Sequence, residues 1–174
     1  MERQIILKKR KYDQGYTLIE MLVVVVAFAV LGIMVLQTLA MSLRGSKKGE
    51  NIVRVKENVD HAISVIDRSL RNAKQLGTPC GGNVVNYIDE YGNTNARFRC
   101  ITDASGTYIA SGAADLRLTN PNEVTITNCT VFTCVSNPNG PDYVEVRIDA
   151  SARNVTNVEG ATYTSTTQIL LRNY

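Results

Sequence analysis

The sequence predicts an α+β fold in which one long N-terminal α-helix packs on a C-terminal antiparallel β-sheet domain. Three observations lead to this fold class. A long apolar run lies near the N-terminus, a stretch with apolar residues at steps of three and four follows it, and short β-type runs separated by Gly, Asn and Pro fill the remainder. We therefore expect four segments along the chain, residues 1–15, 16–43, 44–76 and 77–174.

The net charge of the chain lies in its first segment. The 174 residues carry 19 Lys+Arg and 16 Asp+Glu, a formal charge of +3. Residues 1–15 hold five basic and two acidic side chains, so this segment alone accounts for +3 and the remaining residues sum to zero. A neutral remainder argues against a nucleic-acid partner, because such binding needs a basic surface.

The apolar run indicates a membrane-spanning helix over residues 16–43. Met21 to Leu36 is sixteen residues without a polar side chain, and Glu20 is the only charge between Tyr16 and Leu43. About 20 mostly apolar residues cross a bilayer as a helix. The alternative is the buried core helix of a soluble protein, but the run leaves no polar face.

The flanking charges predict how this helix is oriented. Five basic residues precede it, and Arg44, Lys47 and Lys48 follow it. The positive-inside rule then puts the N-terminus in the cytoplasm and the rest of the chain outside the cytoplasmic (inner) membrane. A cleavable secretory signal peptide is the rival interpretation, but its small-residue site, Ala27-Phe28-Ala29, lies inside the apolar run.

One carboxylate does not fit a plain membrane anchor. A charge deep in a bilayer costs about 2.5–3.5 kcal/mol, unless the side chain reaches the headgroups. Glu20 follows the basic run Lys8–Lys11 and closes the motif Gly15-Tyr16-Thr17-Leu18-Ile19-Glu20. This arrangement resembles the class III leader and N-terminal helix of type IV pilins and of the pseudopilins of type II secretion systems.

The resemblance implies specific processing and partners. Prepilin peptidase would cleave between Gly15 and Tyr16, remove the leader peptide 1–15 and N-methylate Tyr16, and the apolar helix would stay attached. In a filament, Glu20 would set the assembly register by pairing with the Tyr16 amine of a neighbour, because an unpaired charge in an apolar bundle is costly. The chain departs from the family in two ways: Tyr16 stands where Phe is usual, and the apolar helix lacks a Pro, which leaves Gly32 as its weak point.

The second half of the predicted helix is amphipathic. Between Glu50 and Leu76 the apolar positions predict a stripe that packs on the sheet; an independent coiled coil would require a longer heptad repeat. We expect a bend or a weak spot near Gly45 and Gly49, a helix end at Gly77-Thr78-Pro79, and a solvent-exposed His61. The stripe consists of Ile52, Val55, Val59, Ala62, Ile63, Ile66, Leu70 and Ala73.

The remainder reads as short strands of a small sheet domain. Val144, Val146 and Ile148 alternate with charged residues, which is typical of a half-buried strand. The sequence of Thr166–Asn173 in this domain, and parts of the amphipathic helix, resemble those of the minor pilins and J-type pseudopilins. The predicted strands are Val84–Ile88, Arg97–Ile101, Thr107–Ala110, Asp115–Leu118, Glu123–Val135, Tyr143–Ala150 and Thr162–Arg172.

Four cysteines, Cys80, Cys100, Cys129 and Cys134, fall in this exported part. An even number outside the cytoplasm predicts disulfide bonds, which offset a small core. Three pairings are open, and proximity along the chain favours Cys80–Cys100 and Cys129–Cys134, the second of which requires a bend between Asn128 and Val135. A zinc site is the weaker alternative, because there is no close Cys-x-x-Cys pair and no cluster of His.

No catalytic motif is present, so we expect a protein that is not an enzyme and has no cofactor. The sole histidine has no plausible nucleophile near it in sequence, and there is no phosphate-binding Gly-rich loop. Asp89-Glu90 with Asn93, and Asn139 with Asp142, could form calcium loops, although Asp and Asn are also the ordinary residues of turns.

These observations favour a structural and assembly subunit. The resemblance implies a minor pilin or minor pseudopilin that membrane lipid holds before assembly. Its expected partners are prepilin peptidase, other pilin or pseudopilin subunits and the inner-membrane assembly platform. One alternative is a pilus-borne adhesin or DNA-uptake subunit. Another is an unrelated single-pass membrane-anchored protein. For DNA uptake a basic patch would have to form in space from Arg97, Arg99, Arg117, Arg147 and Arg172.

Overall fold

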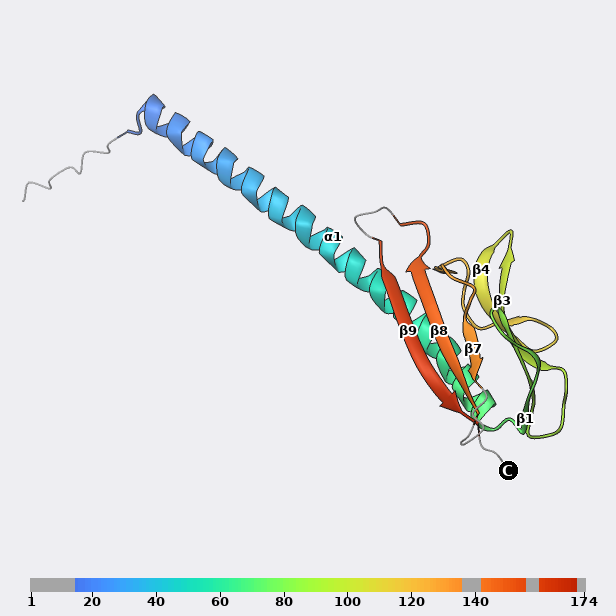
Figure 1. Ribbon diagram of the computed structural model, residues 1–174. Helices are drawn as coiled ribbons and strands as arrows, with labels where there is room; N and C mark the ends of the chain where they lie inside the picture. Colours follow the sequence, from blue (N-terminus) through green and yellow to red (C-terminus); the bar gives the residue numbers. More distant parts are fainter. Residues whose placement is uncertain (1–14, 136–141, 156–159, 172–174) are drawn as a thin grey trace, which may run out of the picture. The chain divides into compact units, whose positions relative to one another are not determined.

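The computed structural model describes residues 15–135, 142–155 and 160–171 (Figure 1). The chain forms two compact units, Met1–Ser42 and Leu43–Tyr174. Helix α1 runs from Leu18 to Arg71, so its first part belongs to the first unit and its second part to the second. The leader peptide lies outside the described residues, apart from Gly15.

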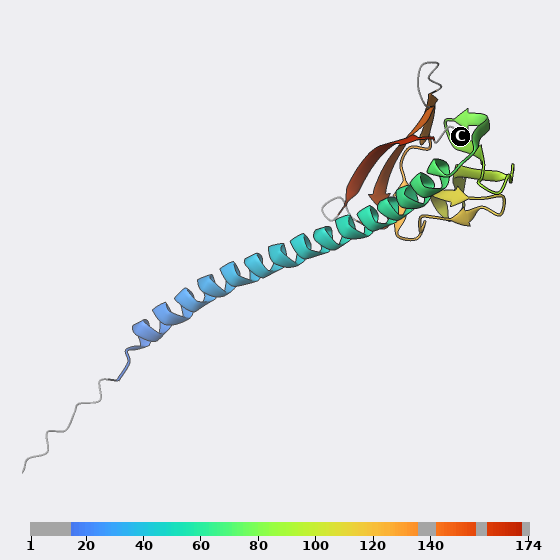
Figure 2. The same ribbon diagram turned by 90° about the horizontal axis from the view of Figure 1, so that it is seen from below.

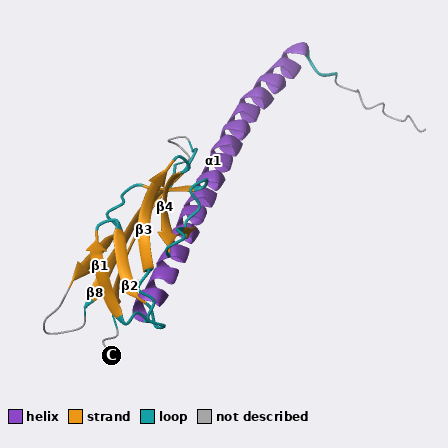
Figure 3. Cartoon of the chain, turned by 90° about the vertical axis from the view of Figure 1, so that its right-hand side faces the viewer, coloured by secondary structure: helices purple, strands orange, loops and turns teal. Residues whose placement is uncertain are grey.

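The second unit contains two antiparallel sheets in its described residues (Figure 3). The first sheet is a simple meander in which each strand pairs with the next along the chain. Its strands are β1 (Gln75–Gly81), β2 (Val84–Ile88), β3 (Ala96–Asp103), β4 (Gly106–Ser111) and β5 (Leu116–Arg117).

The second sheet is built around its longest strand. β8 (Tyr143–Ala152) pairs along its length with β9 (Thr162–Leu170). Its opposite edge pairs with the short strands β6 (Val124–Ile126) and β7 (Phe132–Val135). Figures 1 and 2 both show β8 and β9 beside the second part of α1.

The amphipathic stripe of α1 supplies one wall of a shared core. Val55, Val59, Ala62, Ile66 and Leu70 are fully buried. They belong to one hydrophobic cluster with buried residues of both sheets, which include Val85, Phe98, Ile109, Val144, Val146 and Ile148. The alternation predicted for β8 is thus confirmed, and so is the α+β fold class. His61 is exposed, as expected.

The predicted helix end is wrong. α1 ends at Arg71 instead of Leu76, and Gly77-Thr78-Pro79 lies within β1. The register of β1 against β2 shifts between Leu76 and Cys80, and Pro is tolerated at the irregular edge of a sheet. The helix continues through Gly32, Gly45 and Gly49 without a break.

One predicted strand is really two. Residues Glu123–Val135 form β6 and β7, and residues 127–131 between them are not in a strand. The Asn128 side-chain oxygen accepts a hydrogen bond from the Thr130 N–H at 2.9 Å, which is an Asx turn. The chain therefore turns just after Asn128, although the Cys129–Cys134 bond for which the sequence analysis required a bend does not form.

All four cysteines form disulfides, but the favoured pairing is wrong. The bonds are Cys80–Cys134 and Cys100–Cys129, with Cα–Cα distances of 6.0 and 5.5 Å. β2 lies between the strands that carry Cys80 and Cys100, and two strand spacings of about 4.8 Å exceed the reach of a disulfide. Both bonds instead connect the first sheet to the segment 129–134, which holds the two sheets together.

Candidate functional site

The start of α1 is built by its own sequence. Thr17 directly precedes the first helical residue, Leu18, and its hydroxyl oxygen accepts a hydrogen bond from the Glu20 N–H at 3.3 Å. Thr17 is therefore the N-cap, and Glu20 is the third residue of the first turn. Thr-x-x-Glu is the capping-box pattern, in which the acidic residue also favours the positive end of the helix dipole.

The sequence analysis quoted Thr17 as part of a motif but did not give it this role. The signal was present in the spacing of Thr17 and Glu20 before an apolar run. Glu20 consequently has a local function in the helix start besides any function between subunits.

The residues flanking this cap are open to solvent. Tyr16 is 78% exposed. A Cβ atom built on Gly15 would meet no atom within 4 Å, so packing among the described residues does not require glycine at this position.

The first part of α1 exposes apolar side chains on every face. Its large apolar residues from Leu18 to Leu43 are all at least 43% exposed. By length and composition α1 is a candidate membrane span, and none of its most apolar window is buried within the molecule. The hydroxyl of Thr38 donates to the Met34 carbonyl at 2.6 Å, which satisfies this polar group inside the helix.

Comparison with protein families identifies this segment. A family model described as the prokaryotic N-terminal methylation motif matches residues 10–36. The chain carries an N-terminal methylation motif. The match covers the end of the leader, Gly15 to Glu20 and most of the apolar run, and it supports the type IV pilin-like family. Comparisons with curated proteins and with solved structures find no match for the chain.

The motif indicates which chemical modification the start of the helix undergoes, namely N-terminal methylation. The motif implies processing by prepilin peptidase and assembly with pilin-type subunits. The apolar segment fits a membrane-anchored pilin. The motif points to a structural protein and not to an enzyme.

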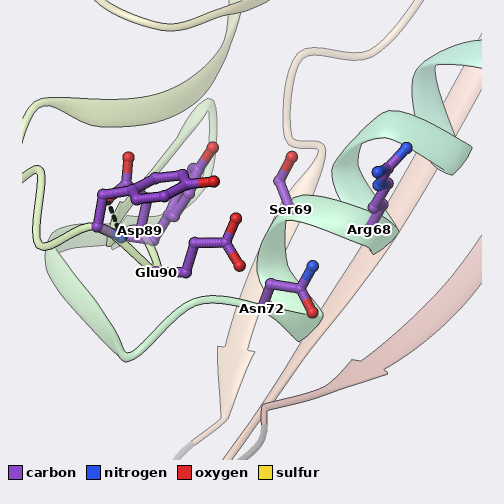
Figure 4. A pocket seen from close by; sticks show the side chains of 7 residues that line it. Arg68, Ser69, Asn72, Asp89 and Glu90 are labelled. Carbon is purple, nitrogen blue, oxygen red and sulfur yellow. Dashed lines mark hydrogen bonds between the residues drawn. The ribbon is translucent and has the colours of Figure 1, made fainter.

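The second unit has a shallow polar pocket beside the end of α1 (Figure 4). It measures about 230 Å³. Burial raises the pKa of Tyr87, and a hydrogen bond to Glu90 raises the pKa of Tyr91. The pocket is lined by Arg68, Ser69, Asn72, Tyr87, Asp89, Glu90 and Tyr91.

Asp89 in this pocket acts as a turn residue. Its Oδ1 atom accepts hydrogen bonds from the backbone N–H groups of Tyr91 and Asn93, at 2.9 and 2.8 Å. An oxygen engaged in this way is a poor calcium ligand. Among the described residues, no group of three or more His, Cys, Asp or Glu could hold a metal ion. Asn139, of the other calcium candidate, lies outside the described residues.

The arginines considered for nucleic-acid binding are paired with carboxylates. Arg99 forms a two-point ion pair with Asp115, and Arg97 lies 3.9 Å from the same carboxylate. Arg117 and Arg147 pair with Asp103 and Asp149, at 3.3 and 3.2 Å. Arg172 lies outside the described residues. The four described arginines thus share three carboxylates and keep a net charge of only +1, which does not favour the strongly basic patch that binding to phosphates requires.

The pairing also affects the acidic partners. The hydrogen bond from Arg99 is the main cause that lowers the pKa of Asp115. Hydrogen bonding to Ser105 is the main cause that lowers the pKa of Asp103. The lowered pKa values favour the charged form of both carboxyl groups. The ion pairs Arg99–Asp115 and Arg117–Asp103 therefore contribute to the surface of the first sheet.

Proposed function

We propose that the chain is a minor pilin or minor pseudopilin, an assembly subunit of a type IV pilus or a type II secretion system. Prepilin peptidase cleaves it between Gly15 and Tyr16 and methylates the new amino group of Tyr16. The processed chain waits in the cytoplasmic membrane with its second unit on the extracytoplasmic side. Its apolar helix then enters a filament, where the subunit primes or decorates the assembly.

The observation that carries this proposal is the first part of α1. An apolar helix with no buried face must be covered by lipid or by other apolar helices, because water is an unfavourable environment for all of its faces. In a helix that only anchored the chain in the membrane, a carboxylate in this segment would be unfavourable and would have no function. Glu20 provides a charge that can pair with the Tyr16 amine of a neighbour and so reward one register.

Gly15 stands directly before the proposed cleavage point. Among the described residues a side chain at Gly15 would meet no atom within 4 Å, so the glycine can be substituted to test the peptidase without disturbing the described fold.

The minor-subunit assignment rests on the second unit. Its local sequence patterns resemble those of minor pilins and J-type pseudopilins, and its two disulfides suit an exported domain. The four described arginines that were candidates for DNA binding share three carboxylates, so DNA uptake is not favoured as its role.

Mass spectrometry of the N-terminus tests the processing step. The full chain is expressed with and without prepilin peptidase and purified from membranes. We expect a chain that begins with methylated Tyr16 only when the peptidase is present. An intact leader in peptidase-containing cells would contradict the proposal and favour an unrelated membrane-anchored protein.

Two glycine variants make this experiment specific. Gly15→Val should retain the leader, because the peptidase must accommodate the new side chain while the fold has room for it. Gly32→Val is the matched control, since a side chain at Gly32 also meets open space and this glycine lies far from the cleavage point in sequence. It should be processed like the parent chain.

The abundance of the chain in sheared filaments tests the minor role. A minor subunit should form a small fraction of the filament protein, and its deletion should lower the number of filaments. If the chain formed the bulk of the filament, it would be a major subunit.

A further inference from the structure

The outer edge of β9 carries no strand among the described residues. β9 pairs with β8 from Thr162 opposite Ser151 to Leu170 opposite Tyr143, without a shift in register. Within the described parts of the chain, β8 is the only strand paired with β9. β9 is therefore an edge strand of nine residues.

The register shows which backbone groups point outward. The Ala152 N–H donates to the Ala161 carbonyl at 2.8 Å, and the Leu171 N–H donates to the Asp142 carbonyl at 3.0 Å. In an antiparallel pair, such hydrogen-bonded positions alternate with positions whose backbone groups face away. The groups that face away from β8 thus belong to Thr162, Thr164, Thr166, Gln168 and Leu170.

The opposite edge of β8 agrees with this assignment. Arg147 is opposite Thr166, and the Arg147 N–H donates to the Val131 carbonyl at 2.8 Å, on the side away from β9. The pair Arg147–Thr166 is therefore one of the positions that exchange no hydrogen bond. The N–H and C=O of Thr166 lie at the middle of the free edge.

Among the described residues, this edge lacks several of the features that normally prevent strand addition. Proteins protect edges with charges, proline, bulges or short strands. β9 contains none of the first three, and it is long. The edges of the first sheet differ, because β1 contains Pro79 and a register shift and β5 has two residues.

We infer that β9 receives an extended strand from a neighbouring, different subunit of the filament. A row of five outward N–H and C=O pairs with strand spacing is matched by an extended polypeptide, whose backbone repeats at the same interval. The β9 edge has no charge, so an uncharged segment fits it best. This inference rests on the proposed function, since it takes the partner from the same filament.

A second copy of this chain that pairs antiparallel through its own β9 is a poorer occupant. Antiparallel pairing of two β9 edges requires a twofold axis perpendicular to the strand. β9 runs in the same direction as the second part of α1 (Figures 1 and 2), so this axis would reverse α1 in one copy. Two subunits anchored in the same membrane need the same direction.

A photo-crosslinker at Gln168 of the full chain, in cells that hold its filament partners, identifies the occupant. Sheared filaments are digested, and mass spectrometry identifies the linked peptide. We expect a peptide from a different filament subunit. Linkage to a second copy, or no linkage while the chain is present in filaments, would overturn the inference and leave the proposed function intact. If the chain were absent from filaments, both would fail.

Substitutions at Thr166 then test whether the backbone is recognised. Thr166→Pro removes an outward N–H that β8 does not use, and Thr166→Val keeps this N–H while it removes the hydroxyl. We expect the crosslink to Gln168 to fall about tenfold in the proline variant, as the loss of a backbone hydrogen bond implies, and to persist in the valine variant. Equal crosslinking by both variants would contradict strand addition.

A charge variant keeps the test valid if proline disturbs β9. Thr166→Lys retains the N–H but places a charge on the edge, which should also lower the crosslink. Thr133→Lys is the matched control, because Thr133 is an exposed threonine of β7 in the same sheet. It should leave the crosslink unchanged. A crosslink that survives Thr166→Lys would count against the inference.

Discussion

The two parts of α1 share one helical backbone but bury their apolar residues in different ways. From Leu18 to Ser42 the apolar side chains are exposed on all faces, whereas from Leu43 to Arg71 most of the predicted stripe, from Val55 to Leu70, is buried; Ile52, which was predicted to belong to it, is 39% exposed. The second part finds its partners in the sheets of the same chain. The first part finds none among the described residues, and its apolar surface fits a cover of lipid or of other subunits.

Charge distribution follows the same division. The first part contains one carboxylate, Glu20, at its start. The second part has surface ion pairs at four-residue spacing, Glu50 with Arg54 at 2.7 Å and Asp67 with Arg71 at 2.8 Å. A surface pair of this kind contributes only a few tenths of a kcal/mol, whereas a charge in an apolar bundle must be paired, so the same residue type has different consequences in the two parts.

Replacing one isoleucine by alanine in each part of α1 should give the largest difference in stability between the two parts. Ile66 is fully buried, and Ile33 is 57% exposed. Ile66→Ala should lower the free energy of unfolding of the second unit by about 2–5 kcal/mol, because it leaves a cavity, and Ile33→Ala should change it by less than about 0.5 kcal/mol. Denaturant unfolding of the full chain in detergent micelles measures both. Similar losses of unfolding free energy in the two variants would contradict the proposed difference between the two parts of α1.

Glycine substitutions give the next largest difference. Gly106 has a φ of 127°, and a Cβ there would lie 2.6 Å from an Arg153 side-chain nitrogen, while a Cβ at Gly32 meets nothing. Gly106→Ala should cost about 1–3 kcal/mol in the same unfolding assay, from backbone strain and from displacement of Arg153. Gly32→Ala should leave the second unit unaffected. An unchanged Gly106→Ala variant would show that the turn relaxes freely.

The contrast also explains what could be predicted from the sequence. The stripe of α1 and the alternation of β8 follow from periodicity, and the apolar segment follows from composition, so these were predictable. β1 was missed because Gly77 and Pro79 normally terminate structure, and only its position at a sheet edge allows them.

The disulfide pairing and the edge of β9 depend on tertiary arrangement. Cys100 and Cys129 come together only because the segment between β6 and β7 lies against the first sheet. Thr17 is a different case, since its spacing from Glu20 already indicated a capping box. The motif around it was interpreted for processing and for assembly register, and not for the start of the helix.

Matched substitutions of the two glutamates test the charge contrast. Glu20→Gln should reduce incorporation into filaments about tenfold or more, since loss of one intersubunit pair worth about 1.4 kcal/mol gives that factor. Glu50→Gln, which loses only a surface pair, should assemble like the parent chain. Both variants should fold normally, because both side chains are exposed. Equal incorporation of the two variants would refute the register function of Glu20.

The smallest expected effect is a pH dependence in the second unit. Asp115 is held in its charged form mainly by the hydrogen bond from Arg99, and its pKa is lowered on folding. Its contribution to stability is therefore present above the unfolded value, about 3.9, and is lost as the pH falls through the lower folded value. Asp115→Asn lacks this contribution at every pH. Asn also tolerates the left-handed backbone at this position, where φ is 53°.

Unfolding of parent and Asp115→Asn chains at a series of pH values measures this effect. The variant should be less stable at neutral pH, and the difference should shrink as the solution becomes more acidic. Some acid dependence should remain in the variant, because Asp103 also has a lowered pKa, mainly from its hydrogen bond with Ser105. A constant difference at all pH values would mean that the Arg99–Asp115 contact acts through geometry and packing, with no contribution from the charge of the carboxylate.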